Sequence, residues 1–268
     1  MAELQVAGMV CLRELIRFSR NRIRVATSLA QPLLFLFVLG TGLSQPSTAA
    51  SSTVDFRTFI FPGVLAMTVL FPAFFSAMTL VWDRQEGFLR EMLVAPVRRS
   101  SVIVGKCLGG SAVALAQGTV MLALAPLVHV PYSPGLLLVL AELALTAFLA
   151  CALGLFVASR LDDIESFQAL IQLLILPIFF LSGALFPLTK LPAWLGSLTR
   201  INPLTYAVDA MRRTILDAIG ASPATIRSLS PGVTWGSVRL SAPVELAIVA
   251  LLGVALLMAA IRQFSRVD

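Results

Sequence analysis

Six long apolar stretches constrain this chain more than any other feature of its sequence. A helix needs about 20 predominantly apolar residues to cross a bilayer, and each stretch approaches that length. Hydrophobic residues make up 58% of the 268-residue chain and charged residues 13%, whereas about a quarter of a soluble domain is charged. We therefore predict an all-α membrane protein with one transmembrane domain over residues 1–268 and no ATPase domain. The expected spans are residues 25–43, 59–81, 107–128, 136–158, 167–186 and 242–261.

The basic residues between these spans indicate the orientation. They gather on the side shared by the N-terminal segment, the second and fourth connections and the C-terminal tail. The positive-inside rule then places both termini in the cytoplasm. Arginine far outnumbers lysine, which is typical of high-GC bacterial genomes, so we expect a multi-pass protein of the bacterial plasma (inner) membrane. The residues concerned are Arg13, Arg17, Arg20, Arg22, Arg24, Arg84, Arg90, Arg98, Arg99, Lys106, Arg160, Arg262 and Arg266.

Residues 1–24 carry a basic, amphipathic pattern. Arg13, Arg17 and Arg20 recur at helical spacing, and Leu12 and Ile16 belong to a neighbouring apolar stripe. A basic amphipathic helix directly before a span suits an anionic membrane surface. We predict an elbow helix that lies on the membrane. Whether it also packs against a cytoplasmic partner stays open.

The region after the fifth span contains a break and several short apolar pieces. Residues 182–187, Ser-Gly-Ala-Leu-Phe-Pro, interrupt the helix, and the pieces at 191–195 and 202–206 are too short to span. Such pieces are tolerated at membrane depth where they are buried against protein or line a cavity. We predict re-entrant and amphipathic outer helices over residues 187–219.

The last of these helices, residues 207–219, has one polar side. Residues at helical spacing there are charged, and a polar loop is expected to follow over 220–240. The charged residues are Asp209, Arg212, Arg213 and Asp217.

The sequence offers little for catalysis or metal binding. Its one histidine, His129, follows the third span, and no phosphate-binding loop or Cys/His ligand spacing is present. We predict no catalytic residue, metal site or cofactor on this chain. Glu142, inside the fourth span, either contacts substrate or protons or reaches the interface, and its place near the span's outer end favours the interface. Gln117, Gln168 and Gln172 are expected to bond to a neighbouring helix rather than to a ligand.

The segment 83–99, between the second and third spans, alternates charged and apolar residues. Glu86 and Arg90 are interleaved with apolar residues such as Leu89, and Pro96 ends the pattern. A solvated loop has no need of an apolar face. We therefore predict an amphipathic helix that lies parallel to the membrane and docks a cytoplasmic subunit.

Two stretches resemble those of a known family. Residues 86–99, EGFLREMLVAPVRR, followed by Gly105-Lys106, are similar to the coupling-helix segment of ABC-2 type permeases. Residues 182–192, SGALFPLTKLP, and 201–213, INPLTYAVDAMRR, resemble that family's C-terminal signature. The resemblance implies a permease that dimerises with a second copy or a paralogue. It also implies two separate ATP-binding subunits, which would carry ATP and Mg²⁺; membrane lipids, and no nucleic acid, complete the expected partners.

Three sets of site residues follow from this resemblance and from the residue pattern. Closure of the ATPase subunits would move the 84–97 helix as a lever and open an outer gate. The expected ATPase contacts are Glu86, Gly87, Leu89, Arg90, Glu91 and Leu93; the gate residues are Gly183, Phe186, Pro187, Asn202, Pro203 and Tyr206; the substrate path holds Phe71, Phe75, Phe179 and Glu142.

The predicted function is ATP-driven export of a lipophilic drug, a lipid or a lipid-linked glycan. Phenylalanine in the path favours a lipophilic substrate, because carbohydrate sites usually use Trp and Tyr, which stack and also hydrogen-bond. The alternative is a secondary transporter or channel that works alone. Such a protein would need an ion site within the membrane and would not need the docking helix.

Overall fold

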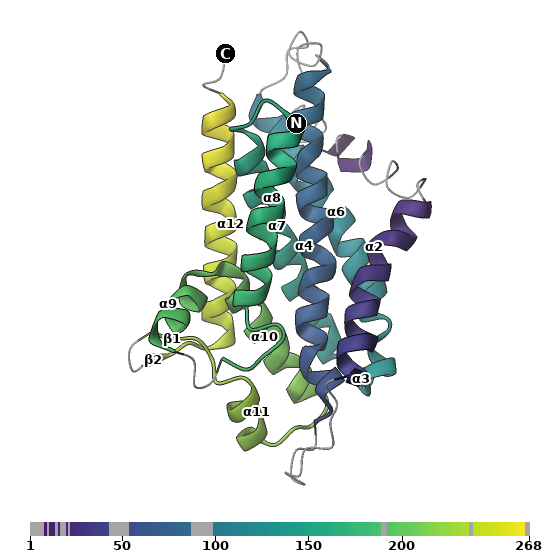
Figure 1. Cartoon of the computed structure of the whole chain (residues 1–268), viewed down its shortest axis with the longest axis vertical. Helices are drawn as coiled ribbons and strands as arrows, with labels where there is room; N and C mark the ends of the chain where they lie inside the picture. The colour runs from purple at the N-terminus through teal and green to yellow at the C-terminus, as the bar shows by residue number, and fades with distance from the viewer. Residues whose placement is uncertain are drawn as a thin grey trace.

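Helices account for nearly all of the regular structure of this chain (Figure 1). The computed structural model describes residues 8–9, 11–13, 16, 20, 22–42, 54–86, 99–188, 192–235 and 238–265. The helices are α2 (Arg22–Leu34), the π-helical turn η1 (Phe35–Leu39), α3 (Gly40–Gly42), α4 (Phe56–Gln85), α6 (Arg99–Leu122), the 3-10 turn η2 (Ala125–Val128), α7 (Gly135–Ala158), α8 (Ile164–Leu181), α9 (Ala193–Ile201), α10 (Pro203–Ala218), α11 (Pro223–Leu229) and α12 (Ala242–Phe264). Two short strands, β1 (Thr234–Trp235) and β2 (Val238–Arg239), pair antiparallel.

Within the described residues, five helices are long and apolar enough to cross a membrane: α4, α6, α7, α8 and α12. They correspond to the second to sixth predicted spans, and the all-α membrane fold is confirmed. The first predicted span, 25–43, is helical from Arg22 to Gly42. Among the described residues, its apolar part is Leu29–Gly42.

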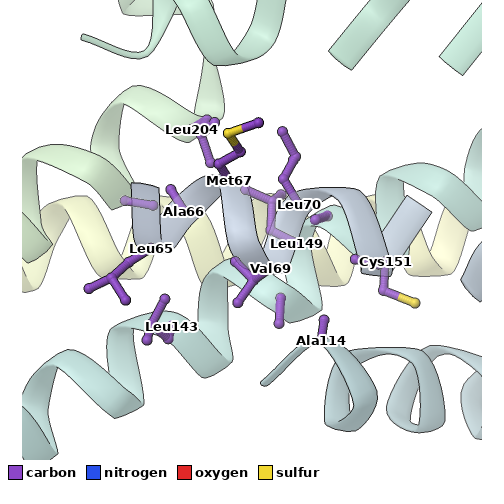
Figure 2. Packing of buried hydrophobic residues seen from close by; sticks show 14 of the residues in the cluster. Leu65, Ala66, Met67, Val69, Leu70, Ala114, Leu143, Leu149, Cys151 and Leu204 are labelled. Atoms are coloured by element: carbon purple, nitrogen blue, oxygen red, sulfur yellow. The ribbon is translucent and has the colours of Figure 1, made fainter. Parts of the chain in front are cut away.

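Helix α4 lies within the bundle and packs against α2, α6, α7, α8 and α10. Nearly every residue from Thr58 to Phe74 is buried. A helix that is apolar all round is stable where other helices surround it. Pro62 and Pro72 lie inside α4 without ending it, since neighbouring helices accommodate prolines in a packed bundle. Figure 2 shows part of this core, with Leu65, Met67, Val69 and Leu70 of α4, Ala114 of α6, Leu143 and Leu149 of α7, and Leu204 of α10.

A buried ion pair joins α4 to α6 at the end of the bundle where α4, α7 and α12 finish, drawn uppermost in Figure 1 and called the upper end below. Lys106 Nζ lies 2.6 Å from Asp83 Oδ2 and donates a hydrogen bond to Thr79 Oγ1 at 3.1 Å. The third predicted span starts at residue 107, but α6 begins at Arg99, so Lys106 lies inside the helix. The boundary differs because a carboxylate on the neighbouring helix neutralises the lysine, which a hydropathy pattern does not register.

We expect Lys106→Met to lower the free energy of unfolding by about 3–5 kcal/mol, because it removes the close partner of the buried Asp83 and leaves only Arg13 Nη2, 3.9 Å away, as a counter-charge. The double variant Lys106→Met/Asp83→Leu should recover most of this loss. Thermal unfolding of the detergent-solubilised protein measures both. Asp162→Asn is the matched control: it removes the exposed partner that Arg84 holds at 2.7 Å and should cost less than about 1 kcal/mol. A Lys106→Met variant as stable as the control would contradict the pair's importance.

Residues 220–240, expected to be a polar loop, contain α11 and the β1–β2 hairpin. The side chain of Ser222 accepts a hydrogen bond from a backbone N–H in the first turn of α11, and Pro223 occupies the first helical position. This Ser-Pro start is a readable helix signal. The hairpin is not readable in the same way, because two-residue strands are too short to show alternation.

Candidate functional site

The predicted gate residues gather at the other end of the bundle, where α8 finishes and α9 and α10 lie, called the lower end below (Figure 1). α8 ends at Leu181, and Gly183 follows with φ 71°, a left-handed conformation that glycine adopts without strain. Phe186 and Pro187 lie half-buried in the turn after it. The helix break expected at residues 182–187 is therefore present.

Asn202 joins the two short helices that follow this turn. Its Oδ1 accepts a hydrogen bond from the Leu204 N–H at 3.1 Å, which caps α10, and its Nδ2 donates to the Ile178 carbonyl of α8 at 2.6 Å. Pro203 occupies the first position of α10, where its missing N–H costs nothing. The Asn-Pro pair thus both starts α10 and ties it to α8.

Tyr206 makes a second connection in the same region. Its hydroxyl donates to the Arg200 carbonyl of α9 at 2.6 Å and accepts from Trp235 Nε1 of β1 at 3.0 Å. Three of the predicted gate residues, Asn202, Pro203 and Tyr206, therefore belong to one connected group of short helices, and Arg212 of α10 bonds Gly183 of the preceding turn to this group. These contacts do not test whether the residues act as a gate, so that role stays a prediction.

Arg212 of α10, only 1% exposed, is the buried cation at the centre of this region. Its Nη2 donates to the carbonyls of Gly183 at 2.7 Å and Ala184 at 3.3 Å. Its Nε donates to the Phe59 carbonyl at 3.4 Å, and the guanidinium lies 4.3 Å from the centre of the Phe59 ring. A guanidinium carries five N–H donors in a planar fork, so one arginine can satisfy several carbonyls at once. Arg212 thereby joins α10, the beginning of α4 and the turn after α8.

Much of the polar side of α10 faces protein rather than solvent, because Asp209 and Arg212 are both buried, whereas Asp217 near the end of the helix is exposed. The sequence shows that these charges share a helix face, but amphipathicity alone does not say whether a polar face meets water or a buried set of partners.

Gly63 of α4 allows the turn after α8 to approach this closely. A Cβ atom at Gly63 would lie 2.7 Å from both the Cα and the carbonyl oxygen of Ala184. Backbone atoms cannot move aside as the end of a flexible side chain can. The contact between α4 and this turn therefore requires glycine.

Arg213 forms a second buried cluster at the lower end. It pairs with Asp209, one turn earlier on α10, and with Glu245 Oε1 of α12 at 2.8 Å. Its Nη1 also donates to the Leu240 carbonyl at 3.0 Å, and the Ser230 hydroxyl donates to Asp209. One guanidinium shared by two carboxylates fixes α10 to the start of α12.

Glu142 of α7 lies in the protein interior, 1% exposed. Its Oε1 accepts a hydrogen bond from Thr214 Oγ1 of α10 at 2.8 Å. The prediction that the Glu142 side chain reaches the membrane interface is therefore wrong, because α10 packs over this part of α7. A short helix that folds back onto a span could not be seen from the span's own sequence.

We expect Arg212→Lys to cost about 2–3 kcal/mol of stability, because one ammonium cannot replace the guanidinium at the Phe59 and Gly183 carbonyls and leaves a buried acceptor unpaired. Thermal unfolding of the solubilised protein measures the loss, and hydrogen exchange over residues 203–212 locates it. The exposed Arg200 provides the control, since Arg200→Lys should stay within about 0.5 kcal/mol. Wild-type stability and exchange in Arg212→Lys would refute the assigned role.

A cavity of about 450 Å³ lies between α2, α4 and α6. Phe71 and Phe75, two of the predicted path residues, line it. The α4 residues of the lining recur every three or four positions, so they share one helix face. That spacing was a usable sequence signal, although the residues on α2 and α6 had none. The full lining is Thr27, Gln31, Pro32, Met67, Phe71, Pro72, Phe75, Met78, Trp82 and Gln117.

The other two predicted path residues do not line this cavity. Phe179 is buried on α8, where its ring meets the edge of Phe35 with centroids 6.3 Å apart and also contacts Phe180. Glu142 is bonded to α10, as described above. The sequence could not separate these residues from Phe71 and Phe75, because all of them lie in apolar helices.

The predicted ATPase contacts follow the upper end of α4. Glu86 is exposed directly after the helix, and Gly87, Leu89, Arg90, Glu91 and Leu93 lie outside the described residues. The neighbouring Arg84 donates to the Leu161 carbonyl at 3.0 Å and to Asp162 Oδ1 at 2.7 Å, which ties α4 to the connection between α7 and α8.

That connection is itself ordered by Asp163, whose side chain accepts the Ser166 N–H at 2.7 Å and caps α8. This hydrogen bond holds the pKa of the Asp163 carboxyl below its usual value, so the cap is present at neutral pH and is lost as the pH falls through that lowered pKa.

Comparison with known proteins agrees with this architecture. The model of the ABC-2 type transporter family matches residues 6–216. The chain is 28% identical over 209 residues to the putative transport permease ycf38 of Cyanophora paradoxa, covering 75% of this chain and 70% of that protein. It is 27% identical over 191 residues to nodulation protein J of Rhizobium leguminosarum bv. viciae, covering 70% and 73%. It is 25% identical over 165 residues to the probable multidrug ABC transporter permease YbhR of Escherichia coli K12, covering 61% and 45%. The chain belongs to the ABC-2 type transporter family.

Proposed function

We propose that this chain is the membrane subunit of an ATP-driven exporter in the bacterial plasma membrane, with both termini in the cytoplasm. It pairs with two separate ATP-binding subunits, which carry ATP and Mg²⁺, and with a second copy of itself or a paralogue. Membership of a transporter family supports the transport role. The name of the Escherichia coli relative, a probable multidrug ABC transporter permease, supports the ATPase partner.

The continuity of α4 carries this proposal. The helix runs for 30 residues without a break, and Glu86, the first predicted ATPase contact, follows its last residue. The same helix supplies Phe71, Phe75 and Trp82 to the cavity wall. Because α4 stays continuous across Pro62 and Pro72, we expect it to move as one element. A displacement of the 84–97 segment by the ATPase subunits therefore moves the wall of the cavity.

The lower end of α4 extends this link to the gate. Phe59, in the first turn of α4, contacts Arg212, which also bonds Gly183. Motion of α4 thus reaches the group of short helices at the lower end through a buried guanidinium. Coupling then requires that the ATP-bound partner favour one arrangement of α4 over another.

The cavity also supports the substrate class. Its α4 face is aromatic and apolar, with Phe71, Phe75, Met78 and Trp82. Such a surface suits a lipophilic drug, a lipid or the lipid part of a lipid-linked glycan.

The alternative function is a secondary transporter or channel that works without an ATPase. Such a protein needs an ion site within the membrane, and Glu142 is the carboxylate predicted to provide it. The structure bonds this side chain to Thr214 and keeps it out of the cavity lining. Glu142→Gln retains an oxygen that accepts the Thr214 hydroxyl. We therefore expect ATP-dependent transport in proteoliposomes to be unchanged by Glu142→Gln. Lost transport with intact ATPase activity would instead favour an ion-coupled mechanism.

We expect the double variant Glu86→Lys/Glu91→Lys to lose its ATPase partner, because it reverses the charge of two predicted contacts. Affinity purification of the solubilised chain from its native membrane, followed by an ATPase assay, measures the co-purified activity. The expected loss is about tenfold or more. Asp217→Lys, a single charge reversal of the same kind at the exposed opposite end, is the control and should retain the partner. Equal co-purification by all three proteins would refute coupling through this segment.

A further inference from the structure

The cavity between α2, α4 and α6 contains an amide group whose oxygen has no partner among the described residues. Gln117 of α6 lines the cavity, yet only 2% of its surface is exposed. Among the described residues, none donates a hydrogen bond to its Oε1. Leaving a buried acceptor unsatisfied costs about 1–3 kcal/mol, so each such group in a folded protein requires an explanation.

The other span glutamines show that this is particular to Gln117. Gln168 donates from Nε2 to Met78 Sδ of α4 at 3.6 Å, which is the predicted bond to a neighbouring helix. Gln172 is exposed on α8. The expectation of a helix-to-helix bond does not explain Gln117, because its oxygen borders a cavity instead.

The rest of the lining defines what could bond to that oxygen. None of the described residues that line the cavity is charged, and Thr27 and Gln31 of α2 add hydroxyl and amide groups at its edge. These described groups suit a neutral ligand, because an ion would lose its hydration without gaining a counter-charge from them. Phe71, Phe75 and Trp82 offer flat apolar surfaces on the α4 side. The volume of about 450 Å³ lies within the range of small-molecule sites.

We propose that this cavity binds an uncharged amphiphile that donates an N–H or O–H hydrogen bond to Gln117 Oε1 and places its apolar body against Phe71, Phe75 and Trp82. The proposal rests on the proposed function in one respect, since it makes this cavity part of the transport route and Gln117 its specificity-determining residue. The ligand comes either from the resident membrane lipids or from the exported solutes, and the shared chemistry is a neutral donor on an apolar body.

Two probes that differ in one group test the donor. N-(4-bromophenyl)dodecanamide carries an N–H, and 4-bromophenyl dodecanoate has an oxygen in its place. The bromine quenches tryptophan fluorescence, and Trp82 lines the cavity. Titration of the purified full chain in nanodiscs should give an amide affinity about five- to tenfold higher than the ester affinity, the value of one hydrogen bond. Trp82→Phe should remove most of the quenching, which locates the probe in this cavity.

Gln117→Leu should bring the amide to the affinity of the ester and leave the ester's own affinity unchanged. The unchanged ester affinity also shows that the variant is folded, and Gln117→Met serves in the same way where the leucine variant does not fold. Gln172→Leu, an identical change at an exposed position, should keep the wild-type preference. Equal affinities in the wild type, a preference that survives in Gln117→Leu, or the absence of quenching by either probe would overturn the proposal.

Mass spectrometry of the lipids that co-purify with the protein distinguishes the two sources of the ligand, resident membrane lipids and exported solutes. A neutral donor lipid present with the wild type and absent from Gln117→Leu indicates a resident membrane lipid, whereas probe binding without such a lipid indicates an exported solute; both support the site. The titration uses this chain alone and needs no ATPase. Its failure is therefore distinct from failure of the Glu86 and Glu91 experiment, which tests coupling.

Discussion

The pairing of buried charges fixes how the helices of this bundle meet. An unpaired charge in an apolar interior costs several kcal/mol, so each buried cation must lie where its partners are. Lys106 therefore specifies the crossing of α6 and α4 through Asp83. Arg212 specifies where α10 meets α4 and the turn after α8, and Arg213 specifies its place beside α12. Apolar packing supplies most of the contact area, but it would tolerate a helix shifted by one turn, whereas these polar contacts would not.

The result is a central helix that is held at both ends. Near its upper end α4 is bonded to α6 through Asp83 and to the α7–α8 connection through Arg84. Near its lower end Thr58 donates to the Val128 carbonyl at 2.8 Å, and Phe59 contacts Arg212. A helix held in this way moves together with its neighbours or tilts as a whole. The predicted ATPase contacts at one end and the predicted gate at the other are thereby connected through a single element.

The sequence predicts this architecture well where the physics is local. Five of the six spans and the break at Gly183 follow from hydropathy and glycine rules. The prediction that the amphipathic helix begins at residue 207 is wrong, because Asn202 caps α10 and Pro203 is its first residue, so the piece at 202–206 belongs to the same helix. The sequence predicts the architecture poorly where two distant segments satisfy each other. Hydropathy alone places Lys106 at the end of a span, whereas its ion pair with Asp83 lets it lie inside α6. The position of Glu142 in its span indicates an interfacial residue, whereas its bond to Thr214 of α10 buries it. Of the candidate path, Phe71 and Phe75 share a helix face with the other lining residues of α4, whereas Phe179 differs from them only in which neighbours surround it.

The position of the cavity follows from the same distribution of bonds. Ion pairs join α4 to α6 and to the α7–α8 connection, while on the cavity side α2 meets it with amide, hydroxyl and apolar groups. Leu34 of α2 and Phe37 and Val38 of η1 are exposed, as on a helix whose outer face meets lipid or a second membrane subunit. Separation of α2 from α4 would break none of the ion pairs named above and would enlarge the space beside Phe71, Phe75 and Gln117. The face of α4 that carries Phe71 and Phe75 is thus a side on which a ligand can enter.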